Sequence, residues 1–274
     1  MRHSSGLVRL EIPCKRNRDW EHRILLSSDR HLDSPYSDRE LQRRHLEAVK
    51  SCGGLVLDFG DLFDAMQGIG DPRASKQALR PELLEGPYWD RLVDEAYSFL
   101  SPYADHIAMI GRGNHEYRVV EKAETDLVQR LADRLHTPAG NYRGFVEISY
   151  RMDNNRTSRY VLYYTHGSGS GGEVTRGVIR TNRRAVYVPD ADIVVSGHVH
   201  ESWIVEVPRL RLRGPHVCVE PQYHLQLPSY KQEALQSAWW DMKDYAPKVV
   251  GAWWLVARYS RTEERVLITF ERAL

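Results

Sequence analysis

The chain has 274 residues, of which 42% are hydrophobic and 27% are charged, a balance that excludes a disordered or collagen-like chain. It carries 38 Lys and Arg against 37 Asp and Glu, so no global basic field exists to collect nucleic acid, and any anion binding must be local. No apolar run approaches the roughly 18 residues of a membrane span, and the N-terminus lacks the apolar core of a signal peptide, so we expect no membrane partner. Cys14, Cys52 and Cys218 have no Cys-x-x-Cys spacing, which favours a reducing cytoplasm and argues against structural zinc held by sulfur.

The first half of the chain alternates strand and helix patterns. Short, continuous apolar runs predict strands that are covered on both faces, and in chain order these runs are 23–26, 54–57, 106–110, 161–164 and 193–195. Ser37 and Glu40 have the spacing of a capping box, which predicts a helix that stops at Gly53. Apolar residues also recur at helical spacing over 89–100 and 127–135. This β-α-β-α-β alternation indicates an α/β domain.

The second half is richer in strands. A hairpin is expected from 145–150 and 161–165, which flank a polar turn at 153–155. Further strands are expected at 205–207, 216–219, 251–258 and 266–270. Because the chain has no repeat, low-complexity tract or obvious linker, we expect a single domain over 1–274. A long loop rich in Gly and Pro is expected at 66–87, and loops of this length are usually functional or disordered.

Polar motifs follow each of the five apolar runs. In chain order they are Asp29-Arg30-His31, Gly60-Asp61-Leu62-Phe63-Asp64, Gly113-Asn114-His115-Glu116, His166-Gly167 and Gly197-His198-Val199-His200. Sites in open α/β sheets form at the carboxyl ends of the strands, so we expect these side chains to lie at such an edge. Chance is a poor explanation, because a Gly-His-x-His motif is expected only roughly 0.04 times in a chain of this length and composition.

The residue types in these motifs point to metal binding. Every group is a hard oxygen or an imidazole nitrogen, with no thiolate, which suits manganese, iron or zinc. Seven such groups are too many for one ion that keeps an open position. They fit two ions that share a bridging carboxylate, and we expect manganese to be the best activator, with iron, zinc and magnesium as alternatives.

As an ordered set, D-x-H, G-D-x-x-D, G-N-H-E, H and G-H-x-H resemble the motifs of the calcineurin-like metallophosphoesterase superfamily. The resemblance covers 29–200, most of the chain. It implies a four-layer α/β/β/α sandwich of two β-sheets flanked by helices. It also implies a two-metal site at the strand ends and the metal-dependent hydrolysis of phosphate esters through a metal-bridging hydroxide.

The resemblance also implies a role for each motif residue. One metal would be held by Asp29, His31 and His200, the other by Asn114, His166 and His198, with Asp61 bridging the two. His115 would lie outside the metal shell and donate a proton to the leaving oxygen. Asp64 and Glu116 would orient the ligands from behind.

Two other interpretations compete with this one. The run 167–172 fits G-x-G-x-x-G, with Asp190 or Asp192 about 20 residues on, as in a dinucleotide-binding fingerprint. However, such a fingerprint opens a helix, whereas Gly177 and the polar run 181–184 are expected to interrupt helix here. The second alternative is a non-catalytic binding scaffold on the same fold, which predicts gaps in the motif set, and the set has none.

The substrate is expected to be a phosphodiester in a nucleic acid, DNA or RNA, or in a nucleotide; the alternative activities are those of a phosphomonoesterase or a pyrophosphohydrolase. Arginine suits bidentate phosphate contacts, and six arginines lie near the ligand motifs. These are Arg112, Arg118, Arg176, Arg180, Arg183 and Arg184. The glycine-serine loop and the compact size are most similar to bacterial and phage-encoded phosphoesterases, loosely akin to the DNA-repair exonuclease branch.

Overall fold

Two β-sheets form the framework of the computed structural model, which describes residues 3–4, 6–65, 80–83, 86–172, 174–232 and 246–273. The first sheet, sheet A, has the strand order β1-β2-β6-β7-β8-β10-β9, and the second, sheet B, has the order β12-β11-β3-β4-β5. Sheet A consists of β1 (His3–Ser4), β2 (Leu7–Cys14), β6 (Arg143–Met152), β7 (Thr157–Thr165), β8 (Ile193–Ser196), β10 (His216–Gln226) and β9 (Trp203–Arg213). Sheet B consists of β12 (Arg265–Ala273), β11 (Ala252–Ser260), β3 (Glu21–Ser27), β4 (Leu55–Asp58) and β5 (Ile107–Ile110).

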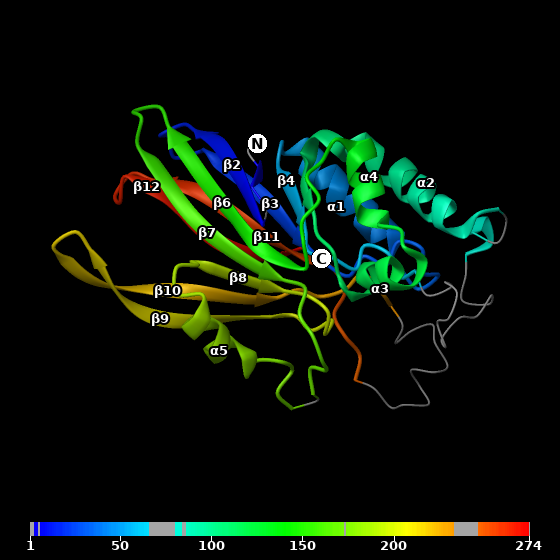
Figure 1. Ribbon diagram of the computed structural model, residues 1–274. Coiled ribbons are helices and arrows are strands. Elements are labelled where there is room, and N and C mark those ends of the chain that lie inside the picture. The colour runs from blue at the N-terminus through cyan, green and yellow to red at the C-terminus, as the bar shows by residue number, and fades with distance from the viewer. Residues whose placement is uncertain are drawn as a thin grey trace.

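The helices cover the outer faces of the two sheets unequally (Figure 1). Against sheet B lie α1 (Arg39–Ser51), α2 (Tyr88–Leu100) and α4 (Leu127–Leu135), while α3 (Asn114–Ala123) follows β5 and α5 (Arg180–Tyr187) lies against sheet A. Two short 3-10 helices, η2 (Pro81–Leu83) and η3 (Ser101–His106), flank α2. The predicted four-layer α/β/β/α sandwich is therefore confirmed. None of the helices in the described residues is long and apolar enough to cross a membrane.

The core is divided into two layers by sheet B. Between the sheets lie residues such as Leu26, Leu57 and Ile148, all fully buried. On the other side of sheet B, residues such as Val56 and Leu131 pack with α1, α2 and α4. The continuous apolar runs that predicted the strands arise because the central strands are buried on both faces.

The parallel strands set the position of the site. In sheet B the pairs β3–β4 and β4–β5 are parallel, and in sheet A the pairs β7–β8 and β8–β10 are parallel. Within each set of parallel strands the carboxyl ends lie at the same edge. The loops that carry the motifs leave the sheets at these edges.

Three local predictions need comment. The first helix is capped by Asp38, whose carboxylate accepts the N–H of Leu41, and not by Ser37, whose hydroxyl donates to the Arg30 carbonyl oxygen. Helix α5 covers the polar run 181–184, where an interruption was expected. The buried Thr181 hydroxyl donates to the Val178 carbonyl oxygen in its own segment, and buried Arg184 donates to Ser196 on β8. Of the loop expected at 66–87, residues 66–79, 84 and 85 lie outside the described residues.

Arg30, the middle residue of the first motif, forms a buried ion pair beneath the site. Its Nε donates to Asp58 Oδ2 at 2.7 Å, and its Nη atoms donate to Ser27 and Gln42 at 3.0 and 3.2 Å. Arg30 and Asp58 are only 1% and 2% exposed. This pair links the end of β3 to the end of β4.

We predict that Arg30→Met lowers the free energy of unfolding by about 3–5 kcal/mol, because it leaves the Asp58 carboxylate buried without its cation. Urea denaturation of the metal-free protein measures this loss. Arg151→Met is the control, because Arg151 pairs with Glu11 on the exposed surface and should matter far less. A loss of under about 1 kcal/mol for Arg30→Met would contradict the prediction.

Candidate metal centre

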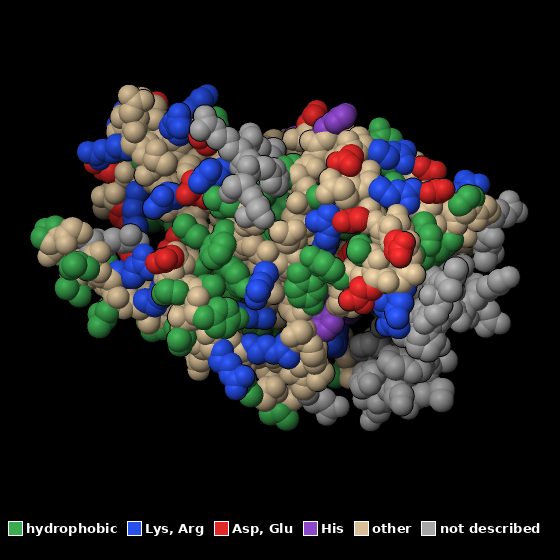
Figure 2. Space-filling view, viewed as in Figure 1, with side chains coloured by type: hydrophobic (Ala, Val, Ile, Leu, Met, Phe, Trp, Pro, Cys, Tyr) green, Lys and Arg blue, Asp and Glu red, His purple; other side chains and the backbone are tan. Residues whose placement is uncertain are grey.

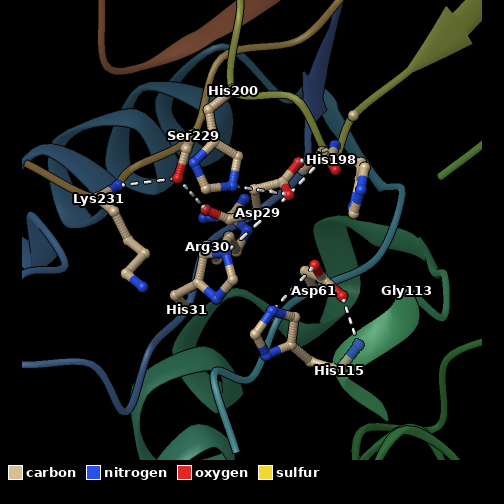
Figure 3. Close-up of polar contacts among 12 residues, drawn as sticks. Asp29, Arg30, His31, Asp61, Gly113, His115, His198, His200, Ser229 and Lys231 are labelled. Atoms are coloured by element: carbon tan, nitrogen blue, oxygen red, sulfur yellow. Dashed lines mark hydrogen bonds and ion pairs between the residues drawn. The ribbon is translucent and has the colours of Figure 1, made fainter. Parts of the chain in front are cut away.

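The polar side chains that follow the parallel strands meet at one place between the two sheets (Figure 3). The structure brings together all seven candidate ligands: six lie in loops that follow their strands, and Asn114 is the first residue of α3. From sheet B come Asp29, His31, Asp61 and Asn114, and from sheet A come His166, His198 and His200.

The first group consists of Asp29, His31 and His200, whose ligand atoms all lie within 4.8 Å of one another. Asp29 Oδ1 is 3.2 Å from His200 Nε2 and 4.0 Å from His31 Nε2. Both ring nitrogens of His31 are buried without a well-aligned hydrogen bond in the described part of the chain, and of the two only Nδ1 has a carboxylate oxygen close by, Asp64 Oδ1 at 2.9 Å. A buried nitrogen without a partner, beside a carboxylate and a second imidazole, is the donor set that a divalent cation would satisfy.

The second group consists of Asp61, His166 and His198, again within 4.8 Å of one another. His166 Nε2 lies 3.0 Å from Asp61 Oδ2 and 3.2 Å from the amide oxygen of Asn114. The two groups adjoin, because His166 Nε2 is also 3.9 Å from Asp29 Oδ1. Asp29 thus contacts nitrogens of both groups, and the bridging role assigned to Asp61 stays a prediction.

His115 belongs to neither of these groups. Its Nδ1 donates to the backbone carbonyl oxygen of Asp64 at 2.5 Å, and its Nε2 lies 3.7 Å from Asp61 Oδ2. Since a carbonyl oxygen can only accept, this contact places a proton on Nδ1 and turns Nε2 toward the site. His115 also forms a third candidate group with His31 and Asp64.

The two residues expected to orient the ligands lie behind them. Asp64 Oδ1 is 2.9 Å from Nδ1 of His31, so the opposite nitrogen of that ring faces the first group. Glu116 accepts the backbone N–H groups of Asp61, Phe63 and Gly113 at 2.7–3.1 Å. Burial, together with Asp61, raises the pKa of Glu116 to about 8. Glu116 thereby connects the loop after β4 to the start of α3.

The backbone around the ligands is strained. Five of the seven candidate ligands have a positive backbone φ of 45–72°, a region that residues other than glycine rarely adopt. They are Asp29, His31, Asp61, His198 and His200. Each such residue costs of the order of 1–3 kcal/mol, and such residues gather at functional sites. The motif glycines serve close approach, because a Cβ on Gly113 would overlap the Asp61 carboxylate and one on Gly197 would overlap Asp29 and Ser28.

Charge in the site is shared unequally among the histidines. Burial opposes a proton on His166, but Asp61 and Asp29 outweigh it and raise the pKa of His166 to about 10. By contrast, burial and the nearby Lys231 ammonium lower the pKa of His31 to about 4. In the metal-free protein at neutral pH, His166 therefore carries a proton while His31 is ready to bind a cation.

We predict that divalent metal binding displaces the proton of His166. Because this proton is held below a pKa of about 10, metal affinity should rise with pH, by roughly tenfold per unit between about pH 6 and 8 for one displaced proton. Calorimetric titration with Mn²⁺ in buffers of different ionisation enthalpy measures both the affinity and the released proton. Equal affinities at both ends of this range, with no proton released, would be the contradictory result.

The six arginines expected to contact substrate occupy different surroundings. Arg112 is buried and bonds to Asp126, Gln129 and the Gly140 carbonyl oxygen, and Arg184 is buried against Ser196. Substrate contact is not supported for these two, because their guanidinium groups are committed to interior partners.

The remaining four lie closer to the surface. Arg118 is half-buried on α3, and Arg180 donates to the carbonyl oxygen of Ser168 in the glycine loop. Arg176 and Arg183 are exposed, before and on α5. Figure 2 shows Lys and Arg side chains over α5 and its neighbouring segment.

The structure does not support a dinucleotide-binding fingerprint in the glycine loop. Its fingerprint requires the glycine loop to lead into a helix, but α5 begins only at Arg180.

Sequence reasoning missed the segment after β10, which also reaches the site. Ser229 Oγ and the Tyr230 N–H both donate to the backbone oxygen of Asp29, and Lys231 Nζ lies 3.1 Å from Asp64 Oδ1. The available signal was topological, since β10 runs parallel to β8 and ends at the same edge. Only 216–219 of this strand was expected, so its end at Gln226 was not seen.

No family model and no curated protein matches the chain. Among the solved structures that resemble the chain are the following three, each of which matches 92% of its length. GAP50, the anchor in the inner membrane complex of Plasmodium, matches over 85% of its own chain at 10% identity and a TM-score of 0.45. The calcineurin-like phosphoesterase YfkN from Bacillus subtilis matches over 91% of its own chain at 11% identity and a TM-score of 0.43. Vps29 from Entamoeba histolytica, complexed with zinc, matches over 99% of its own chain at 14% identity and a TM-score of 0.39. These likenesses concern the fold, and the chemistry of the site rests on the residues described above.

Proposed function

We propose that this protein is a metal-dependent phosphoesterase of the metallophosphoesterase type, and that it hydrolyses phosphodiesters in a nucleic acid or nucleotide. The observation that carries the proposal is the pair of adjoining carboxylate–histidine groups around Asp29 and Asp61, with His115 directed at the site from outside both.

The residues fit two divalent cations. Asp29, His31 and His200 would hold one, and Asp61, Asn114, His166 and His198 the other. Two such cations would polarise a phosphoryl group and lower the pKa of a bound water. Manganese as the native metal is part of the proposal, since all donors are oxygen or imidazole nitrogen, and so is a location in the reducing cytoplasm, which the odd number of cysteines favours.

His115 is the group that can move a proton. Its Nδ1–H is fixed by the Asp64 carbonyl oxygen, so Nε2 is the atom that can face a leaving oxygen. Burial disfavours the imidazolium, but the carboxylates of Asp61 and Asp64 outweigh burial and raise the pKa of His115. The protonated Nε2 can therefore donate its proton to the oxygen that departs from phosphorus.

A phosphodiester substrate is supported by arginines on the segment that follows the candidate ligand His166. Arg180 donates to the carbonyl oxygen of Ser168, two residues after His166, and Arg176 and Arg183 on the same segment are exposed. A polyanion would gain from contacts with such arginines beyond its reacting phosphate. The phosphomonoesterase and pyrophosphohydrolase alternatives use the same centre and need fewer of these contacts.

A parallel assay with Mn²⁺ tests the choice of substrate. The substrates are bis-p-nitrophenyl phosphate, p-nitrophenyl phosphate, and single- and double-stranded DNA. We expect turnover of the diester and of DNA. Turnover of the monoester alone would overturn the phosphodiesterase assignment, and no turnover with metal bound would favour the scaffold alternative.

We predict that His115→Ala retains both metals but lowers kcat by roughly 10²–10⁴-fold, the usual contribution of a general acid or base. The loss should be smaller for bis-p-nitrophenyl phosphate than for DNA, because p-nitrophenolate leaves without needing a proton. Metal content and kcat on both substrates are measured together.

Asp61→Asn is the comparison variant for this prediction. Loss of the carboxylate should weaken metal binding and abolish turnover of every substrate alike. If His115→Ala also empties the site, His115 is a ligand or a support. If it keeps full activity on DNA, the proton comes from elsewhere.

A further inference from the structure

Lys231 lies outside every motif, yet its side chain reaches the edge of the candidate metal centre beside His31 (Figure 3). The side chain is 9% exposed, and its Nζ is 3.1 Å from Asp64 Oδ1. We propose that Lys231 is a positioning residue, whose ammonium fixes the Asp64 carboxylate so that His31 presents its Nε2 to the first metal. The inference rests on the proposed function in one respect, the assignment of His31 as a metal ligand.

The backbone that carries Lys231 is fixed on the centre itself. Its N–H donates to Ser229 Oγ at 3.0 Å, and that hydroxyl donates to the Asp29 carbonyl oxygen at 2.8 Å. On the other side, Lys231 forms a β-bridge with Ser37, and the Tyr230 carbonyl oxygen accepts the N–H of Asp38. The lysine therefore starts from a defined position, unlike a lysine on a surface loop.

Asp64 connects the lysine to the ligands. Its Oδ1 contacts both Lys231 Nζ and His31 Nδ1, at 3.1 and 2.9 Å. Its backbone is held as well, since its N–H donates to Asp33 Oδ1 and its carbonyl oxygen accepts from His115. With the backbone fixed, the remaining freedom of Asp64 is the rotation of its carboxylate, and the Lys231 ammonium restrains that rotation.

The charge of Lys231 also explains why the third candidate group, His31, Asp64 and His115, need not hold a metal ion. His31, Asp64 and His115 are close enough to hold an ion. However, the ammonium already contacts Asp64 Oδ1, and Nδ1 of His115 already donates to the Asp64 carbonyl oxygen. This group thus contains its own cation, which leaves His31 Nε2 for the group with Asp29 and His200.

The test is calorimetric titration of the full-length protein with Mn²⁺. For the wild type we expect two sites. Lys231→Met should weaken one of them by about 10–100-fold, the usual effect of losing a group that orients a ligand, and leave the other unchanged. Lys231→Arg should restore most of the affinity. Lys50→Met is the matched control, because Lys50 is an exposed lysine that donates to the Pro102 carbonyl oxygen, and it should behave as the wild type.

Two backgrounds identify the affected site. When Lys231→Met is added to His200→Ala, in which the first metal group is already incomplete, the Mn²⁺ affinity should not fall further. When it is added to His198→Ala, in which the first metal group is intact, the affinity of that group should fall by the full factor of about 10–100. Asp64→Asn should reproduce the same selective loss, and it takes the place of Lys231→Met if thermal unfolding shows that the latter does not fold.

The outcomes separate the two proposals. A wild type that binds no Mn²⁺ overturns the proposed function. A wild type with two sites, together with Lys231→Met or Asp64→Asn that binds as the wild type does, overturns the positioning role alone. A loss spread equally over both sites, or one that Lys231→Arg does not restore, also overturns it.

Discussion

Two carboxylates, Asp29 and Asp61, are buried where the two sheets meet, with exposures of 0% and 1%. Burial of an ionised carboxylate costs several kcal/mol unless cations and hydrogen bonds compensate it. Around these two the compensation is dense: His200 contacts Asp29, and His166 contacts both carboxylates. The N–H of His198 donates to Asp29, and that of His115 to Asp61. Divalent cations would complete this arrangement, and we infer that the strained backbone of the surrounding loops serves to hold their ligands in place.

That strain depends on support from outside the ligand set. The left-handed backbone at Asp29 and His31 brackets Arg30, which is anchored to Asp58 in the interior. On the opposite side, Ser229 holds the carbonyl oxygen of Asp29. A buried ion pair in this position is weak support for stability in itself, but it sets the direction in which the two flanking ligands leave the strand.

Much of this architecture could be predicted from the sequence, and the reason is physical. Buried parallel strands give continuous apolar runs, and their carboxyl ends must lie together, so the motif after each run locates a ligand. Contacts between distant segments leave no such mark. Arg112 and Arg184 are of the residue type that binds phosphate, but their guanidinium groups are held by interior partners. Lys231 belongs to no motif, because only the length of β10 brings it to the site. Helix α5 was missed because its buried Arg184 is satisfied by Ser196 on sheet A, a partner that the local sequence does not contain.

The central claim is that the two carboxylate–histidine groups form one binuclear centre. Crystals of the wild-type protein soaked in Mn²⁺ and measured at the manganese absorption edge test it directly. The account predicts two anomalous peaks roughly 3.5–4 Å apart, one beside His31 and His200 and the other beside His166 and His198. A single peak, or a peak between His31, Asp64 and His115, would contradict it.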